Sequence, residues 1–446
     1  MGFFEDALGG IAEGLGAAAS TVGEAATTVA GAVGGAAGAA ADAIGTTVST
    51  ATSDLYSSFG GSVGIEQGDN LKLKDGSYLL PEPVINDEES HELDVLTKRY
   101  DKLNKPGLIV RAGDALGQVM PDFVKDAFDN AGETISSAEL FKSAMKIVAE
   151  GFGAIEKQAA SASVSSDYVV NQINRGKQEQ KVSSIEEICL LRSNDVARVA
   201  GAERAGHLSL AFVEGAATGA PGFAGIPFNL VLSTFLFFRA VQSMAMFYGY
   251  DVKGNPDEMV VAGEVIMAAY GAGEQGPNGS VAAGYVGKIM AISEAEVAKQ
   301  VVGKGWTAMA SRGGVTLLLT QMRALAHASA RKALVNAGEQ GLEKSVFASV
   351  FTQIGKRLTQ SAIKGAVPIV GGVIGALFDS GVMGRMLDFA EVFYHKRFIL
   401  EKELRVRSLA EGTPFYEVVE EVSDVDTDAV VEEAERIVEE ETETSE

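Results

Sequence analysis

The chain has 446 residues, 46% of them hydrophobic, which is enough for a large buried core. Its net charge of −23 lies almost entirely at the two ends, since residues 1–71 contribute −8 and residues 411–446 contribute −14, which leaves −1 for residues 72–410. The sequence has no cluster of lysine and arginine interleaved with aromatic residues, and acidic ends repel phosphate. This distribution argues against a nucleic-acid partner and against a halophilic surface.

The first predicted element is an arm over residues 1–57, rich in alanine, glycine and threonine, that repeats every eleven residues. This period equals about 3.67 residues per helical turn, so a helix would keep the repeated positions on one face. Each interior glycine costs about 1 kcal/mol relative to alanine, so the helix would need a surface on which to fold. We expect membrane lipid or another apolar assembly to contact the large apolar residues of this face, Leu8, Ile11, Leu15, Val22, Val33, Ile44 and Val48.

The arm has no lysine or arginine, so attraction by anionic lipid is not expected. The alternative interpretation is a flexible arm whose spacing is coincidental. Because the first basic residue is Lys72, the chain also lacks the cationic region of a secretory signal. We therefore expect a cytoplasmic protein, with peripheral membrane attachment or export by another route as alternatives.

Residues 58–91 mix glycine, proline and acids and indicate a linker, with or without one short strand. From residue 92 to residue 410 the pattern is helical, with glycine and proline at the breaks and no alternating strand pattern. Ser184 and Glu187 form a candidate capping box. The only cysteine, Cys189, follows in an apolar run and is interpreted as a small buried hydrophobic residue. We predict an all-α fold with one large helical domain and glycine-rich helix junctions.

The most distinctive stretch is the charge-free segment from Gly215 to Phe238. Its length is that of a membrane span, but Pro221, Pro227 and four glycines interrupt its first half, and Arg239 ends it. We interpret the segment as a glycine-rich turn followed by a buried helix.

This segment and its flanks, EGAATGAPGFAGIPFNL and FFRAVQSMAMFYGYD, resemble the EcsC protein family, named from a protein encoded beside a bacterial ABC transporter. The upstream run NKPGLIVRAGDALGQVMPDFVKDAF and the downstream run AVPIVGGVIGALFDSGVMGRMLDFAEVFYHKRFILEKE are similar to the family's early and closing helices. The resemblance covers roughly residues 95–405. It implies a helical architecture and no particular activity. Asn229 stands where many members have an acid, so the resemblance implies no acid chemistry at this turn.

Polar residues within and beside this segment are the candidate ligand-binding or network residues. Burying such groups without partners costs several kcal/mol between them, so some must pair with one another. One interpretation is a polar network that locks helices in register, and the other is a pocket for a small ligand or lipid headgroup. The candidates are His207, Glu214, Asn229, Arg239, Gln242, Tyr248 and Asp251.

Other motif matches predict no catalytic, metal or cofactor site. Gly60–Gly64 fits GxSxG without the strand and helix that a nucleophile elbow needs. Gly271–Gly276 fits GxGxxG but follows an expected helix, whereas a dinucleotide site needs a strand there. The four histidines lack metal-ligand spacing, and we expect each to lie on the surface or in a hydrogen bond.

Residues 411–446 hold fifteen acids and one base. The density of like charge favours a solvated, partly disordered acidic tail, and one or two short amphipathic helices are the alternative.

Two functions follow from these patterns. The first is a non-enzymatic EcsC-like protein, with a possible protein partner, that associates peripherally with a membrane or apolar assembly through the repeat of its arm. The second is a hydrolase-like enzyme for a lipid or peptide substrate, with His207, Glu214 and Arg239 acting near the Gly219–Gly225 turn.

Overall fold

The structure is a computed structural model that describes residues 69–103, 137–158, 164–175, 180–203, 226–271, 281–293, 314–338, 341–363 and 380–443. The N-terminal arm with all its predicted contact residues lies outside this part of the chain, as do the GxSxG match and the Gly219–Gly225 turn.

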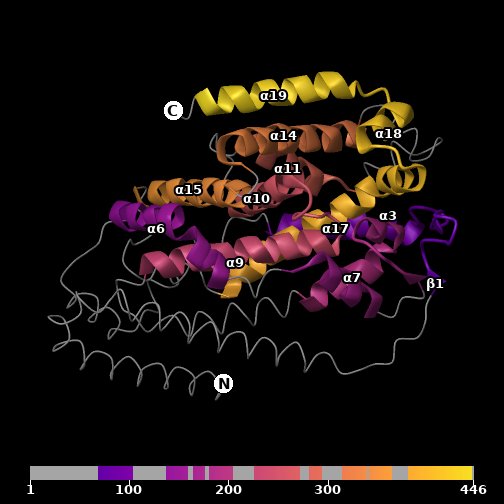
Figure 1. Cartoon of the computed structure of the whole chain (residues 1–446), viewed down its shortest axis with the longest axis horizontal. Coiled ribbons are helices and arrows are strands. Elements are labelled where there is room, and N and C mark those ends of the chain that lie inside the picture. Colours follow the sequence, from indigo (N-terminus) through magenta and orange to yellow (C-terminus); the bar gives the residue numbers. More distant parts are fainter. Residues whose placement is uncertain are drawn as a thin grey trace, which may run out of the picture. The chain divides into compact units, whose positions relative to one another are not determined.

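The described residues form an all-α fold, which confirms the predicted class (Figure 1). The helices of its first half are α3 (Asp87–Leu103), α6 (Ser137–Gln158), α7 (Ser166–Arg175), η2 (Glu186–Leu190) and a helix that begins at residue 193. Those that follow are α9 (Ile226–Phe247), α10 (Pro256–Gly271), α11 (Val281–Ala291), α14 (Gly314–Ala337), α15 (Leu342–Ile363), α17 (Ser380–Glu411), α18 (Phe415–Val422) and α19 (Thr427–Glu443).

The extended structure of the described residues is small. Strand β1 (Asp69–Asn70) pairs in parallel with β2 (Gln180–Lys181), with Asp69 opposite Gln180, and a single antiparallel bridge joins Lys72 to Tyr78. The short strand allowed for in the linker is therefore present. It ties the start of the described chain to the segment before η2.

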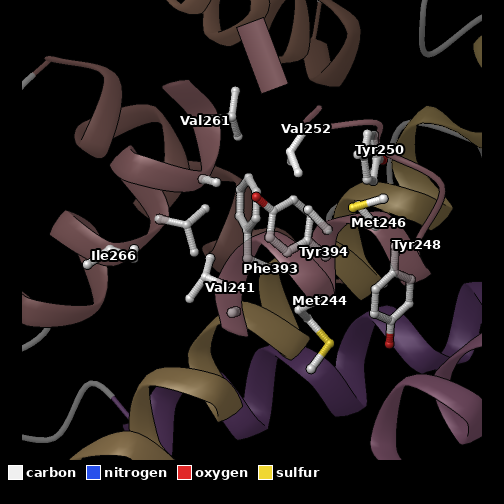
Figure 2. Close-up of a cluster of buried hydrophobic side chains, with 14 of the residues drawn as sticks. Val241, Met244, Met246, Tyr248, Tyr250, Val252, Val261, Ile266, Phe393 and Tyr394 are labelled. Atoms are coloured by element: carbon white, nitrogen blue, oxygen red, sulfur yellow. The ribbon is translucent and has the colours of Figure 1, made fainter. Parts of the chain in front are cut away.

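Helix α17 is the central element, because it packs against α3, α10, α11, α14, α18 and η2. Its aromatic residues Phe389, Phe393 and Phe398 are buried, as a helix surrounded by other helices requires. Figure 2 shows Phe393 and Tyr394 among side chains of α9 and α10, including Val241 and Val261. The core thus extends around this helix rather than lying on one side of it.

Helix α9 confirms the buried helix predicted after the glycine-rich turn. Its residues Val231, Phe235, Phe238 and Val241 are fully buried. An edge-to-face contact joins Phe235 to Phe347 of α15, with ring centroids 5.2 Å apart. Not one of the helices in the described ranges has both the length and the apolar character needed to cross a lipid bilayer.

Cys189 is buried in η2 as predicted, and burial raises the pKa of its thiol. The predicted capping box beside it is wrong, because η2 has no side-chain cap and Glu187 accepts instead from the backbone N of Ser183, at 2.6 Å. A true capping box lies at α3. The Glu89 N–H donates to Asn86 Oδ1 at 2.8 Å, and the Asn86 N–H donates to Glu89 Oε2 at 3.1 Å.

The expectation of a solvated, partly disordered tail is wrong for residues 415–443, which form α18 and α19. Val418, Val419 and Ala434 are buried against the helices beneath them. The density of like charge led to the prediction of a solvated segment. The apolar residues nevertheless recur at helical spacing, and packing of α18 and α19 on α14 and α17 removes them from water. The amphipathic alternative is the one that the structure contains.

Candidate functional site

The structure describes the side chains of four of the seven predicted polar residues. His207 and Glu214 lie outside the described residues, and Asn229 lies in α9 without a described side chain. Arg239 and Gln242 lie one turn apart on α9, and Tyr248 and Asp251 follow the end of that helix.

Arg239 and Gln242 meet around an acid that the sequence analysis missed, Glu343 in the first turn of α15. Arg239 Nη1 lies 2.6 Å from Glu343 Oε1, and Gln242 Nε2 donates to the same oxygen at 3.4 Å. Arg239 also donates to Gln242 Oε1 at 3.2 Å. Arg239 Nε is buried without an acceptor among the described residues. This cluster ties α9 to α15 in register.

Tyr248 and Asp251 do not join that cluster. The Tyr248 ring stacks on His395 of α17, with centroids 5.5 Å apart, and burial raises the pKa of its hydroxyl well above 10. Asp251 caps its own turn by accepting from the backbone N–H groups of Lys253 and Gly254, at 3.0 and 2.9 Å. Of the four described candidates, Arg239 and Gln242 therefore contact each other, whereas Tyr248 and Asp251 each make separate contacts elsewhere.

One polar assembly of the described residues is a quartet at a helix junction, which we define as Glu258, Arg323, Arg397 and Glu401. Arg397 is fully buried and donates to both carboxylate oxygens of Glu258, at 2.6 and 2.8 Å. Arg323 of α14 donates to both oxygens of Glu401, at 3.1 and 2.6 Å, and Arg397 Nε donates to Glu401 at 3.0 Å. Two guanidiniums thus balance two carboxylates where α10, α14 and α17 meet.

Electrostatics within the quartet keep the Glu401 carboxylate ionised. Burial alone would raise the pKa of Glu401, but Arg323 and Arg397 lower it to about 2. Aromatic faces cover the cations, since the Tyr250 ring centroid lies 4.0 Å from the Arg397 guanidinium carbon. Each charge is therefore held by several groups.

A second group joins α17 to α3 and to the helix that begins at residue 193. Glu89 accepts from the fully buried Lys402, from Arg192 at 3.2 Å and from the Ser193 N–H at 2.9 Å. Glu92 lies 2.9 Å from His395 Nε2 and accepts from the Ser193 hydroxyl. Burial opposes ionisation of Glu92, yet these hydrogen bonds lower its pKa.

Lys396 of α17 is fully buried and donates to neutral acceptors. Its Nζ lies 2.6 Å from Thr97 Oγ1 and 2.5 Å from the carbonyl of Met290, and it also reaches the carbonyl of Ile292. These carbonyls belong to the end of α11, where a cation is favourable. Lys396 thus fixes α11 against α3 and α17.

Paired and desolvated charges resist sliding, so these contacts hold helices in register. Among the predicted residues, Arg239 and Gln242 take part in such a contact. Across the described ranges, no three His, Cys, Asp or Glu side chains are arranged to hold a metal ion. His395 and His327 each contact a carboxylate, the latter Asp257 at 3.1 Å. The ligand-binding and enzymatic roles of His207, Glu214 and Arg239 stay predictions.

The model of the EcsC protein family matches residues 98–399, which include the whole quartet except Glu401. No curated protein and no solved structure shows significant similarity to the chain.

Proposed function

Because the chain belongs to the EcsC protein family, we propose that its helical domain is a non-enzymatic scaffold that the N-terminal arm attaches peripherally to a lipid surface. The observation that carries this proposal is the eleven-residue repeat of residues 1–57, whose apolar positions share one helical face.

The composition of the arm sets the kind of surface. Its apolar face is built from valine, leucine and isoleucine among alanines, and its other face is glycine, serine and threonine with a few acids. A helix of this kind gains stability from apolar burial and none from attraction to anionic headgroups. We therefore propose neutral, highly curved membrane with exposed acyl chains as the preferred surface.

The paired charges of the domain support the scaffold part of the proposal. Arg239 is neutralised by Glu343, and the two arginines of the quartet pair with its two glutamates in bidentate contacts. Such groups maintain a fixed arrangement of helices, which suits a domain that carries an attachment segment.

Vesicle flotation tests the proposal. The full chain should float with neutral, highly curved vesicles, and a chain lacking residues 1–60 should stay in the lower fraction. The variant Val22→Ser/Val33→Ser/Ile44→Ser should also fail to float, because it removes three apolar side chains that are each worth about 1.5–3 kcal/mol when fully buried and less at an interface.

The matched control is Thr28→Ser/Thr46→Ser/Thr50→Ser, which makes an equal number of changes at positions on the opposite helical face. It should float like the parent. If the full chain and the truncated chain both remain unbound, the lipid surface is the wrong target for the arm.

A further inference from the structure

Helices α14 and α19 have opposite charge. Helix α14 has three bases and no acid, whereas α19 contains eight acids and one arginine. Of these bases, Arg323 belongs to the quartet, and Arg331 and Lys332 contact α19. The two helices pack against each other, and Figure 1 shows α19 lying alongside α14. A cationic helix is thus covered by an acidic one.

The contact between them is extensive, and its buried centre is small and apolar. Ala434 of α19 is buried against Ala324, Leu325 and Ala328 of α14. Small residues at a crossing let two helices approach closely, and larger residues then flank the contact. On α19 the flanking residues lie three or four positions from Ala434 and are Val430, Val431, Ile437 and Val438.

Polar contacts at the rim are exposed or half-buried. Arg331 pairs with Glu435, with side chains 63% and 42% exposed, and Lys332 Nζ lies 3.5 Å from the carbonyl of Val438. Exposed pairs of this kind contribute little stability but fix orientation and depend on salt. They position α19 without holding it tightly.

Helices α18 and α19 are also set apart from the main core. Their buried residues belong to two small clusters, one around Ala434 and one that joins Val418 and Val419 to Leu404 of α17, and both are distinct from the large core cluster. The connection from α17 is the non-helical turn at Gly412, whose φ is +67°. Elements attached through small satellite clusters open at lower free energy than the core.

The α19 sequence is poorly suited to form a helix alone. Eight acids in 17 residues place like charges three and four positions apart, which destabilises an isolated helix. A short helix is marginal in water even without this repulsion. Its helical form therefore depends on the cationic, apolar face of α14.

From these observations we propose that the outer face of α14 is a docking site for acidic amphipathic helices. In this chain α19 occupies the site, and α18 and α19 leave it together as one unit that turns at Gly412. The external ligand is a helix of the same chemistry, with alanine at the crossing, valine or isoleucine beside it and acids on its rim, which binds when α19 is displaced.

Peptide binding tests the site. The probe is a labelled peptide of residues 413–443, added to the full chain and to a chain that ends at residue 412. The shortened chain should bind the peptide one to one, more weakly as salt rises. The full chain should bind at least about 100-fold more weakly, because its own segment competes at an effective concentration in the millimolar range.

Three results would overturn the proposal. In one, a shortened chain that keeps its circular dichroism spectrum and cooperative unfolding binds no peptide. In another, both chains bind it equally. In the third, the shortened chain floats with anionic vesicles while ignoring the peptide, which would assign the face to lipid instead.

Hydrogen exchange on the full chain tests release even if the shortened chain does not fold. Amides of residues 415–443 should exchange together and faster than those of α17. Glu435→Arg should speed this exchange about two- to fivefold, which is the effect of losing one exposed pair. Adding Arg331→Glu should restore the parent rate. Glu439→Arg, the same change at an exposed position of α19, serves as the matched control. Exchange of α19 as slow as that of α17 would refute release as a unit.

Discussion

Single charged residues on α17 determine whether the helices packed against it keep their register. Arg397 is fully buried and neutralises Glu258 while supporting Glu401. Removing one member of a buried pair leaves the other desolvated and unpaired, whereas replacing both with apolar residues is often nearly neutral. The stability of the quartet should therefore fall when one member of a pair is replaced and change less when both members are replaced together.

We predict that Arg397→Met lowers the free energy of unfolding by about 3–5 kcal/mol in urea denaturation. Combining it with Glu258→Leu should recover at least about half of that loss, since Arg323 and Glu401 still balance each other. The surface variant Arg198→Met, which removes an exposed pair with Asp195, should change stability by less than about 0.5 kcal/mol. A double variant less stable than the single one would contradict this account of the quartet.

Acid should weaken the same quartet. The pKa of Glu401 is about 2 in the folded chain against an ordinary value of 4.5, so the unfolded chain binds the proton more readily. A lowered pKa gives stability that is complete above about pH 4.5 and is lost as the pH falls towards 2. Glu92, whose pKa is also lowered, acts in the same direction.

We predict that protonation of Glu401 lowers the free energy of unfolding by up to about 1.4 kcal/mol for each unit by which the pH falls between about 4.5 and 2. Glu401→Gln should be less stable than the parent at pH 7 and should show a flatter dependence below pH 4.5. Urea denaturation at a series of pH values measures both. Parallel curves for parent and variant would mean that Glu401 is not the responsible carboxylate.

Helix contacts, at the next scale, depend on small residues where two helices cross. At Gly355 of α15 an added Cβ would overlap the ring of Phe141 of α6, which stacks on Phe351 with centroids 5.1 Å apart. Gly153 on α6 has no atom within 4 Å of such a Cβ. The two glycines therefore provide a matched pair, one at a crossing and one facing open space.

We predict that Gly355→Ala destabilises the protein by about 1–3 kcal/mol, because the ring must move out of its packing position. Gly153→Ala should stabilise it by about 0.5–1 kcal/mol, since alanine is the better helix former. Thermal unfolding of both variants distinguishes the effects. Equal shifts in Tm would show that the α6–α15 contact is looser than the structure has it.

At the scale of the whole molecule, the acidic C-terminal helix α19 packs on α14, whereas the arm, which has acids but no bases, has a predicted external partner. Acidic α19 packs on α14, and its Glu435 pairs with Arg331 of that helix. The arm of residues 1–57 has six acids and no lysine or arginine to pair with them. Its folding must depend on apolar contact.

We predict that a peptide of residues 1–56 is mostly unfolded in water and gains helix on neutral, highly curved vesicles. Anionic lipid should not increase the gain, because the peptide has no lysine or arginine. Circular dichroism with and without each type of vesicle measures this. An unchanged gain in Val22→Ser/Val33→Ser/Ile44→Ser would mean that the repeat does not form the contact face.

The sequence alone was sufficient for features that depend on local patterns. Periodicity and breaks predicted the all-α class and the buried helix that became α9, and an apolar neighbourhood predicted the burial of Cys189. These features follow from which side chains leave water and from the 3.6-residue turn, and both are readable within a short window.

Partner choice was decided only by the tertiary structure. Arg397 pairs with Glu258, 139 positions away, and Arg323 pairs with Glu401, 78 positions away. Arg239 contacts the predicted Gln242 and also Glu343, an acid that lay outside the predicted set. The acidic segment was expected to remain solvated because its sequence gives the repulsion among its own acids but not the bases of α14. The sequence gives the position of each charged residue along the chain. The electrostatic energy of that charge depends on which charges lie near it in space and on how far packing excludes water, and only the tertiary structure gives these.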